Sequence, residues 1–218
     1  SGLDALMAVA DDELDAAQPA PGKSVTVKDW QCAELDLVAL LVTVGGYKVT
    51  TLKLWGCAIA PSDLLLLKLG LPPSVTTLAV EGCETPAPGR FAPLFAPAPP
   101  GVSLLSLRCC GIGADEVADL APALAENPAL TALSLWGNPL GDAGAKALAA
   151  SVGSLRWLSL GNTRLGLKGA KSLSGALAEN ATLTSLDLSQ NRVGSELGAP
   201  ILEMLQTNVT LTSLDLRG

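Results

Sequence analysis

The chain has 218 residues, 49% of them hydrophobic and only 3% aromatic, so leucine, alanine and valine must build its core. Histidine is absent, which excludes catalytic triads and metal sites that depend on imidazole. The net charge is −7 and lysine and arginine form no cluster, which argues against a nucleic-acid partner. No apolar stretch reaches the roughly 18 residues of a membrane span, so we expect no membrane partner.

The N-terminal residues 1–21 are acidic, with five aspartates and glutamates and no lysine or arginine. One face of an amphipathic helix is marked by Leu3, Leu6, Ala10 and Leu14. We expect this helix and the linker after it to cap the first repeat, because a solenoid leaves the core of its terminal units uncovered. The alternative is an acidic helix that binds a groove of a partner protein.

A repeat begins after this segment. The hexapeptide LTSLDL occurs at residues 183–188 and again at 211–216, which start 28 residues apart. The same frame of apolar residues at positions one, four and six starts at residues 22, 49, 75, 102, 130, 155, 183 and 211. A turn and a stretch of helical periodicity follow the frame. Residues 22–218 therefore form one repeat domain of about seven repeats plus a final strand.

The ninth position of the units completes the pattern. It is occupied in chain order by Trp30, Cys57, Cys83, Cys110, Asn138, Thr163 and Asn191. With the motif L-x-x-L-x-L-x-x-(N/C/T)-x-(L/I/V), the chain resembles the leucine-rich repeat proteins of the ribonuclease inhibitor-like class. Segments such as LTALSLWGNPLGDAGAKALAASV carry the resemblance, which covers residues 22–218.

Each unit supplies one short strand and one helix, and neither can bury its apolar face alone, so stacked units share a continuous core. Parallel strands lie about 4.8 Å apart, whereas a helix is about 10 Å wide. This difference forces the stack of units to curve, with the strands on the inner side. The expected fold is an α/β leucine-rich repeat solenoid, a horseshoe with a parallel β-sheet on the concave face and helices on the convex face. Positions three, five and seven face the concave side.

Two units depart from the regular pattern. The unit from Val75 places six prolines within residues 86–100, which a regular helix cannot accommodate. We expect an irregular convex segment there, either a degenerate repeat, which we favour, or a proline-rich docking loop. The unit from Leu130 has only 25 residues, so we expect a shortened loop between its helix and the next strand. Asp142 is expected to cap the helix of this unit.

Cys57, Cys83 and Cys110 hold the ninth position of consecutive units and should form a column about 5 Å apart. Three thiols could bind a metal or form a redox site, but no fourth ligand and no histidine accompany them. We favour the interpretation that these small side chains replace an asparagine ladder in the turn. We therefore expect no metal and no cofactor.

The five cysteines show no spacing typical of a disulfide framework, which indicates a reduced intracellular location. The cytoplasm is the expected compartment, with the cytoskeleton or a cilium as further settings. Sequons at Asn180 and Asn208 argue weakly for the secretory pathway. They hold equivalent positions in two units, so the repeat itself explains them.

Large side chains gather at the positions that face the concave side. The candidate partner-binding residues are Trp55, Leu104, Arg108, Trp136, Trp157, Asp187 and Asp215. Tryptophan and arginine are enriched in the hot spots of protein interfaces. The two aspartates lie side by side, where they could await a basic partner or form a solvated polar end. The alternative for the tryptophans is that another segment of the chain folds over them.

These features predict a non-catalytic module or scaffold, not an enzyme, that binds a protein partner on its concave face. A cytoskeletal or ciliary assembly is one setting for such a module. The resemblance implies two alternatives. One is a regulator of an enzyme, because similar repeats occur in the Ran GTPase-activating protein, and the other is the repeat domain of a longer NOD-like sensor. The strand at 211–216 would leave a sheet edge unpaired, so we expect further repeats or another chain to cover it.

Overall fold

The computed structural model describes residues 22–29, 34–83, 91, 94, 99, 101–191 and 195–218, with the backbone alone at 34–36 and 195–197. The acidic segment 1–21 and its expected capping helix lie outside these residues. Each helix in the described part of the chain is too short or too polar to cross a bilayer.

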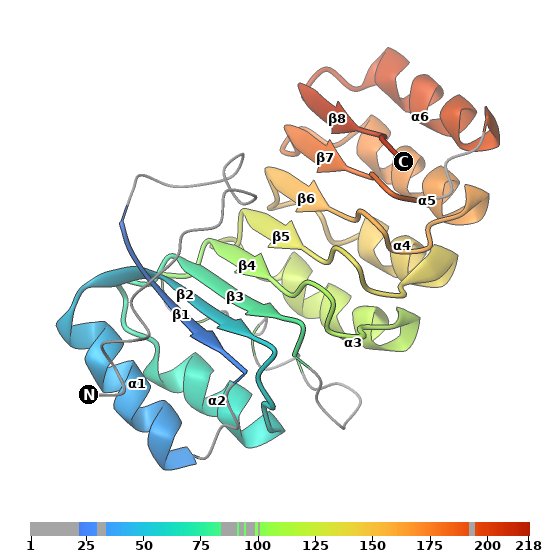
Figure 1. Ribbon diagram of the computed structural model, residues 1–218. Coiled ribbons are helices and arrows are strands. Elements are labelled where there is room, and N and C mark those ends of the chain that lie inside the picture. The colour runs from blue at the N-terminus through green and yellow to red at the C-terminus, as the bar shows by residue number, and fades with distance from the viewer. Residues whose placement is uncertain are drawn as a thin grey trace.

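Strands and helices alternate along the described chain, except that β4 follows β3 with no described helix between them (Figure 1). The strands are β1 (Lys23–Lys28), β2 (Val49–Trp55), β3 (Thr77–Glu81), β4 (Leu104–Ser106), β5 (Ala132–Ser134), β6 (Trp157–Ser159), β7 (Ser185–Asp187) and β8 (Ser213–Asp215). The helices are α1 (Glu34–Gly46), α2 (Pro61–Gly70), α3 (Ala114–Ala125), α4 (Gly141–Ala149), α5 (Leu167–Ala178) and α6 (Ser195–Thr207).

The strands form one parallel sheet in which each strand pairs with the next, from β1 to β8. The register aligns the fourth position of every unit. The residues joined in this way are Val25, Leu52, Leu78, Leu105, Leu133, Leu158, Leu186 and Leu214. The repeat frame predicted from the sequence is therefore confirmed, strand by strand.

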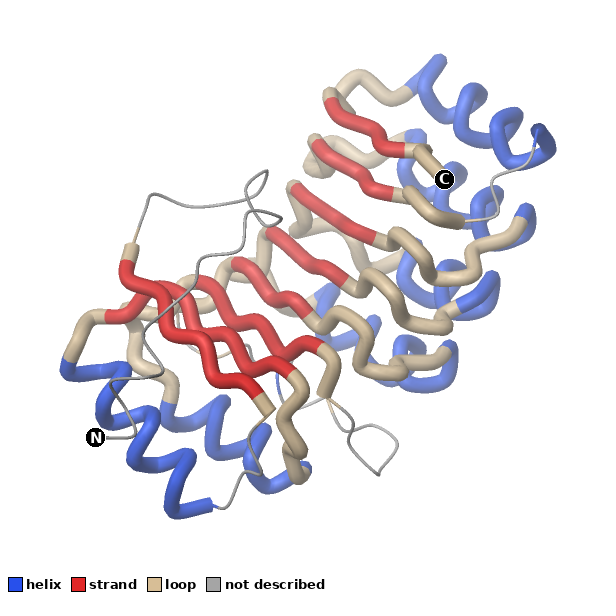
Figure 2. The backbone as a smooth tube through the Cα atoms, viewed as in Figure 1, coloured by secondary structure: helices blue, strands red, loops and turns tan. Residues whose placement is uncertain are grey.

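The helices all lie on one side of the sheet and form the outer side of a curved solenoid (Figure 2). Neighbouring helices pack on one another, as α3 does on α4 and α5 on α6. Because a helix is wider than the spacing between strands, the helical side is the longer side of the arc. The expected α/β solenoid with an open parallel sheet is confirmed.

One hydrophobic core lies between sheet and helices and runs from Val25 in β1 to Met204 in α6. The fourth and sixth positions of the strands supply one side of it: Leu52 and Leu54 are 0% and 1% exposed. Full burial of a leucine side chain contributes about 1.5–3 kcal/mol. Since this core is continuous across the units, neighbouring repeats share buried surface and depend on one another for stability.

A buried side chain ties the turn of one unit to the turn of the unit before it. Asn138 is 0% exposed, and its Nδ2 donates to the carbonyl oxygens of Leu107 and Leu135 at 2.6 and 2.8 Å. Its Oδ1 accepts from the backbone N–H groups of Cys110 and Ile112 at 2.9 and 3.1 Å. One amide thus satisfies four backbone groups that the turns would otherwise bury without partners.

The cysteine column performs part of the same task. The thiols of Cys57, Cys83 and Cys110 donate to the sixth-position carbonyl of the preceding unit, at sulfur–oxygen distances of 3.7, 3.5 and 3.0 Å. Asn138 makes its bond to Leu107 at the same place in the repeat. These contacts favour a structural ladder over a metal or redox site. Among the described residues, no group of three histidine, cysteine or acidic side chains could hold a metal ion.

Asp142 caps a different helix from the one expected. It lies inside the first turn of α4, and its Oδ1 accepts from the backbone N–H groups of Gly166 and Gly169 at 2.7 and 2.9 Å. These donors belong to the start of α5, so the carboxylate satisfies the helix of the following repeat. The expectation considered only neighbours in sequence, whereas α4 and α5 lie side by side.

The unit from Leu130 is short because its helix has fewer residues than the helices on either side. Helix α4 has nine residues, whereas α3 and α5 have twelve each. Residues 150–156 connect α4 to β6 and are no fewer than residues 126–131, which connect α3 to β5. The expected shortening of the loop is therefore wrong.

Three residues of the proline-rich segment are described, and all are buried. Phe91 and Leu94 are 0% exposed and belong to the core. Pro99 is buried as well, and the backbone N–H of Phe91 donates to Oε1 of Glu116 at 3.4 Å. This burial favours the degenerate repeat over the docking loop at these residues. The other residues of 86–100 lie outside the described chain.

The sequon asparagines stabilise the turns between helix and strand. Nδ2 of Asn208 donates to the carbonyl oxygens of Leu177 and Asn180 at 2.6 and 3.1 Å. Its Oδ1 accepts from the N–H groups of Thr210 and Leu211 at 2.9 and 2.7 Å. N-glycosylation replaces one hydrogen of Nδ2 and would break at least one of these bonds, which supports the structural interpretation of this sequon.

Candidate functional site

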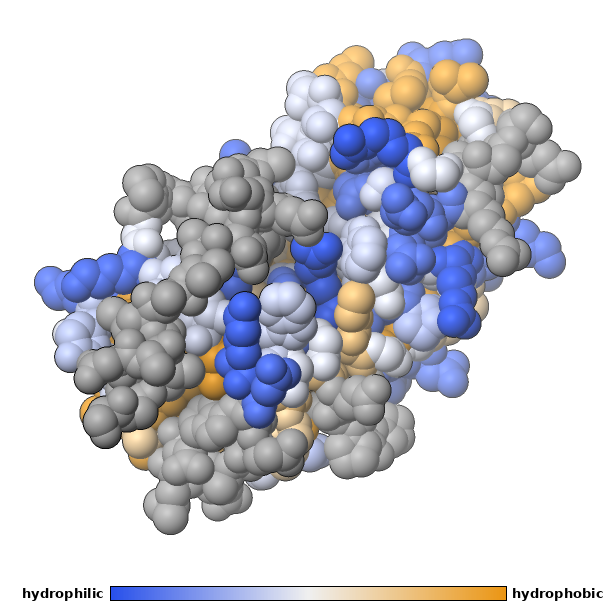
Figure 3. All heavy atoms as spheres, in the orientation of Figure 1, coloured by the Kyte–Doolittle hydropathy of each residue, from blue (hydrophilic) through white to orange (hydrophobic). Residues whose placement is uncertain are grey.

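Three rows of side chains cross the concave face from β5 to β8, because the strands pair in register. The rows read Ala132, Trp157, Ser185, Ser213 at position three; Ser134, Ser159, Asp187, Asp215 at position five; and Trp136, Gly161, Ser189, Arg217 at position seven. The tryptophans belong to the units of β5 and β6, the charged groups belong to those of β7 and β8, and the other positions hold glycine, alanine or serine. Hydrophilic side chains gather over β7 and β8 (Figure 3).

This arrangement leaves a hollow of about 510 Å³ on the concave face. Five candidate residues line it, namely Arg108, Trp136, Trp157, Asp187 and Asp215. Serines of the concave face, Leu186, Gln190 and Arg217 complete the lining. The structure thus gathers residues from strands β4 to β8, more than 100 positions apart in sequence, around one depression.

Trp136 is in contact with a cation and a glycine. The guanidinium carbon of Arg108 lies 4.9 Å from the centroid of the Trp136 ring, within the range of a cation–π interaction. A Cβ added at Gly161 would lie 2.4 Å from Cδ1 of Trp136 and 2.9 Å from Oγ of Ser189. The missing side chain at Gly161 is therefore what admits the indole. These contacts fix the ring before any ligand arrives.

Trp157 packs on a small apolar cluster formed by Leu104 and Ala132. Leu104 is only 1% exposed, whereas Trp157 is half-buried. Leu104 therefore supports Trp157 and offers almost no surface of its own to a partner. The sequence placed Leu104 on the concave side, but it could not show that this side chain is buried in a cluster on which Trp157 packs.

Asp187 is half-buried at the floor of the hollow and is held by two hydrogen bonds. Oγ of Ser159 donates to its Oδ2 at 2.6 Å, and the backbone N–H of Ser189 donates to its Oδ1 at 2.8 Å. Both donors are neutral, so neither of them places a positive charge beside this carboxylate.

Asp215 differs because an arginine binds it. Nε of Arg217 lies 3.0 Å from both carboxylate oxygens, and Nη2 lies 2.6 Å from Oδ2. The hydrogen bonds from Arg217 lower the pKa of Asp215 below its ordinary value of 3.8. The same pair raises the pKa of Arg217, to which the charge of Asp187 also contributes.

Trp55 lies outside the hollow, although it is exposed. It is 48% exposed at the end of β2, and Nζ of Lys28 lies 4.9 Å from the centroid of its ring. Strands β3 and β4 separate it from the tryptophans of the hollow. If Trp55 binds a partner, it contributes a second contact at some distance from the first.

The sequence prediction missed the serines and Arg217. Serines at positions three and five carried no signal by themselves, since small polar residues are common on solvated strands. Arg217 stood at the seventh position beside Asp215, but its bidentate contact depends on side-chain geometry. A search for alternating small and large residues along the rows would have indicated a depression here.

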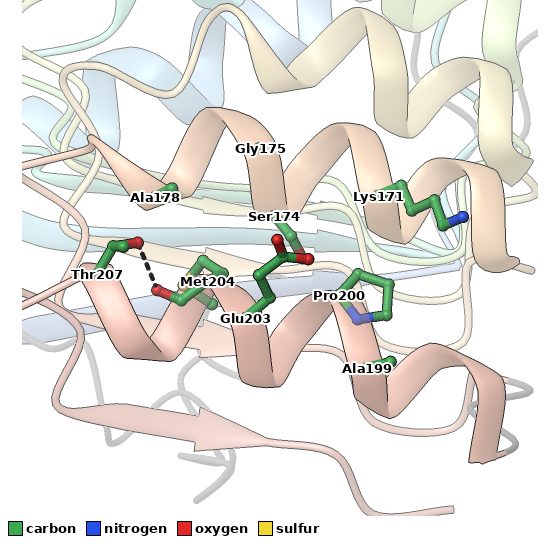
Figure 4. Close-up of a pocket in the computed structure, with 9 residues that line it drawn as sticks. All are labelled: Lys171, Ser174, Gly175, Ala178, Ala199, Pro200, Glu203, Met204 and Thr207. Carbon is green, nitrogen blue, oxygen red and sulfur yellow. Dashed lines mark hydrogen bonds between the residues drawn. The ribbon is translucent and has the colours of Figure 1, made fainter.

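A second hollow, of about 610 Å³, lies on the convex side between α5 and α6. Small residues such as Gly175, Ala178 and Ala199 line it, together with the larger Met204. The carboxylate of Glu203 points toward Ser174 on the facing helix (Figure 4). This groove lacks the tryptophans and the paired charges of the concave hollow, so the concave hollow is the stronger candidate.

The C-terminal end of the described sheet exposes apolar side chains beside α6 (Figure 3). Leu211, Leu214 and Leu216 are half-buried in the last unit. Leu186 holds the position of Leu214 in the preceding unit, and it is only 2% exposed because β8 covers it. The expectation that further repeats or another chain cover this edge stays a prediction.

Comparisons with known proteins agree with the repeat. A family model described as "Leucine Rich repeat" matches residues 126–149 and 179–196. The chain is 39% identical over 147 residues to "NACHT, LRR and PYD domains-containing protein 5" of Bos taurus, an alignment covering 64% of this chain and 13% of that protein. It is 37% identical over 92 residues to the human "NACHT, LRR and PYD domains-containing protein 7", covering 40% of this chain and 9% of that protein. The chain thus spans a small part of these relatives.

Two solved structures share the fold. The leucine-rich repeat-containing protein LegL7 of Legionella pneumophila superposes with a TM-score of 0.59 at 20% identity, over 88% of this chain and 63% of that one. One chain of the crystal structure of the Rad7 and Elc1 complex in yeast superposes with a TM-score of 0.55 at 16% identity, over 88% of this chain and 49% of that one. The matched motif, the register of the strands and these superpositions agree. The chain is a leucine-rich repeat protein.

Proposed function

We propose that this chain is a non-catalytic interaction module that binds a protein partner in the concave hollow. The observation that carries the proposal is that Trp136 and Trp157 share one depression with Arg108 and two carboxylates. Tryptophan and arginine supply much of the binding energy of protein interfaces when a partner desolvates them. If the partner is an enzyme, the module acts as its regulator.

Cysteine chemistry supports an intracellular setting for this module, with the cytoplasm as the compartment that we propose. The described cysteines are thiols rather than disulfides. Three of them are buried in the turn ladder, where their hydrogen bonds require the reduced form. A reducing compartment keeps such thiols intact. A cytoskeletal or ciliary assembly is one setting within this proposal.

Affinity capture from native lysate followed by mass spectrometry tests the concave site. The baits are the wild type, a Trp136→Ala/Trp157→Ala variant, and a control variant Leu69→Ala/Leu202→Ala. The control removes apolar surface from the convex helices, where the two leucines are 73% and 62% exposed. Circular dichroism first establishes that all three baits fold.

A partner held by the wild type and the control but lost by the concave variant supports the proposal. A partner that all three baits hold equally places the interaction elsewhere and contradicts it.

A second candidate function is the repeat domain of a longer NOD-like sensor. The observation that favours it is the similarity to two proteins whose names include NACHT, LRR and PYD domains. The full-length transcript of the natural gene separates the two candidates. A nucleotide-binding domain encoded in the same reading frame would favour the sensor, and its absence would leave the module to act alone.

A further inference from the structure

The two copies of LTSLDL allow one repeat to be compared with the other at the hollow. Asp187 and Asp215 end the two copies and pair directly across β7 and β8. In both copies the backbone N–H two residues later donates to Oδ1, from Ser189 at 2.8 Å and from Arg217 at 3.0 Å. The two carboxylates are therefore held in the same way by their own repeats.

The copies differ at the seventh position. In the last unit Arg217 places its guanidinium on Asp215, with three contacts between 2.6 and 3.0 Å. In the preceding unit the residue is Ser189, which is too short to reach back to Asp187 with a charge. Among the described residues, Asp187 has no ion pair within 4.0 Å, although the field of Arg217 reaches it.

Asp187 can still accept further hydrogen bonds. A carboxylate offers about four acceptor positions, and Ser159 and Ser189 use one on each oxygen. Asp187 is half-buried and lines the hollow. A cationic group that entered the hollow would find a carboxylate already oriented by two hydrogen bonds.

An aromatic wall stands next to this carboxylate. Trp157 pairs with Ser185 and Ser159 pairs with Asp187, so the indole and the carboxylate are diagonal neighbours on one face. Diagonal neighbours of this kind lie about 7–8 Å apart at the backbone, within reach of an aromatic side chain. The residues that pair with them, Ser185 and Ser159, are small, so no large side chain stands between the indole and the carboxylate.

From this geometry we infer that the hollow receives an arginine side chain of the protein partner, with its guanidinium on Asp187 and against the ring of Trp157. This inference rests on the proposed function and names the chemistry of the partner. Arginine fits better than lysine, because its planar fork binds a carboxylate at two points and stacks on an indole. Arg217 on Asp215 shows the same recognition within the chain.

Nuclear magnetic resonance of the indole N–H groups provides the test. The probe is N-acetyl-arginine methylamide, and the matched probe is the citrulline analogue, which has the same shape without the charge. We expect arginine to shift the signals of Trp157 and Trp136, which Trp→Phe variants assign, and to leave the distant Trp55 unchanged. Equal shifts with citrulline, or no shift up to the solubility limit of the probe, would overturn the inference.

Three variants sharpen this test. Asp187→Asn should weaken binding of the arginine probe by at least about tenfold, since the substitution removes the charge of the side chain but keeps its shape. Asp119→Asn, an exposed residue of the convex helix α3, is the matched loss of one charge and should change nothing. Ser189→Arg recreates the sequence LTSLDLR and should place an internal guanidinium on Asp187, so that the probe no longer binds. Full binding in Asp187→Asn or in Ser189→Arg would contradict the inference.

The inference and the proposed function can fail separately. If the arginine probe does not bind while Trp136→Ala/Trp157→Ala still loses its captured partner, only the inference that the hollow receives an arginine is wrong. If that variant keeps its partner, the concave site itself is wrong, whatever the probe does.

Discussion

An added Cβ at Gly161 would lie 2.4 Å from Cδ1 and 2.6 Å from Nε1 of Trp136. Two neighbouring strands thus fit together on the concave face, with the glycine of one admitting the indole of the other. The same indole lies 4.9 Å from the guanidinium carbon of Arg108. The position of Trp136 therefore depends on three consecutive repeats and on no single one of them.

Gly161→Ala should displace the indole of Trp136 and disturb its stacking with Arg108, without removing a polar group. We expect a change in tryptophan fluorescence and a loss of partner capture, with little loss of helical circular dichroism. Gly153→Ala is the matched control, because a Cβ at Gly153 meets nothing within 4 Å. An unchanged Trp136 indole signal in Gly161→Ala would show that the ring does not need this space.

Asn138→Ala should lower the free energy of unfolding by about 2–4 kcal/mol, because it leaves two buried N–H groups and two buried carbonyls without this partner. Urea denaturation measures the change. Cys110→Ala is the comparison, since its thiol makes weaker bonds at the equivalent position, and we expect a loss of about 1 kcal/mol. Equal losses in the two variants would mean that the amide adds nothing to the ladder.

Cys83 should resist alkylation in the folded protein, whereas the exposed Cys109 should react. A hydrogen bond with the Cys57 side chain and burial raise the pKa of Cys83 above its ordinary 9.0, so the thiol stays protonated at neutral pH. Peptide mapping after treatment with iodoacetamide, with and without urea, measures both residues. Labelling of Cys83 at the rate of Cys109 without urea would contradict the ladder.

The raised pKa of Cys83 also gives a pH dependence. The folded state holds this proton more tightly than the unfolded state, so the contribution to stability is present below the unfolded value and is lost as pH rises above about 9. Unfolding by urea at neutral and alkaline pH should show this loss, and Cys83→Ala should reduce it.

Asp215 should titrate below its ordinary value of 3.8, because the hydrogen bonds from Arg217 stabilise the carboxylate. The folded state then holds the proton less tightly than the unfolded state. Its small contribution to stability is present above the unfolded pKa and is lost as pH falls through the lower folded pKa. Carboxyl-detected nuclear magnetic resonance measures the titration, and Arg217→Gln should move the pKa of Asp215 back up. A pKa that does not respond to Arg217→Gln would show that another group causes the shift.

Much of the fold followed from the sequence because the repeat is local and periodic. The frame that aligns Leu52 with Leu78 is written in the spacing of apolar residues, so the register needed no further information. Two expectations failed, one about a contact between repeats and one about the length of a helix. Asp142 binds the helix of the next unit, and the short unit from Leu130 shortens its helix instead of its loop.

The candidate site likewise has features that the sequence period predicts and features that depend on contacts between repeats. The sequence determined that Trp136, Trp157, Asp187 and Asp215 face one side of the sheet, because strand side chains alternate with a period of two. Only the tertiary structure decided that Leu104 lies covered against Trp157, that Trp55 stands apart, and that small residues open a hollow between the rest. The physical reason is that a period specifies the direction of a side chain, whereas depth and charge pairing depend on the size and reach of side chains on neighbouring strands.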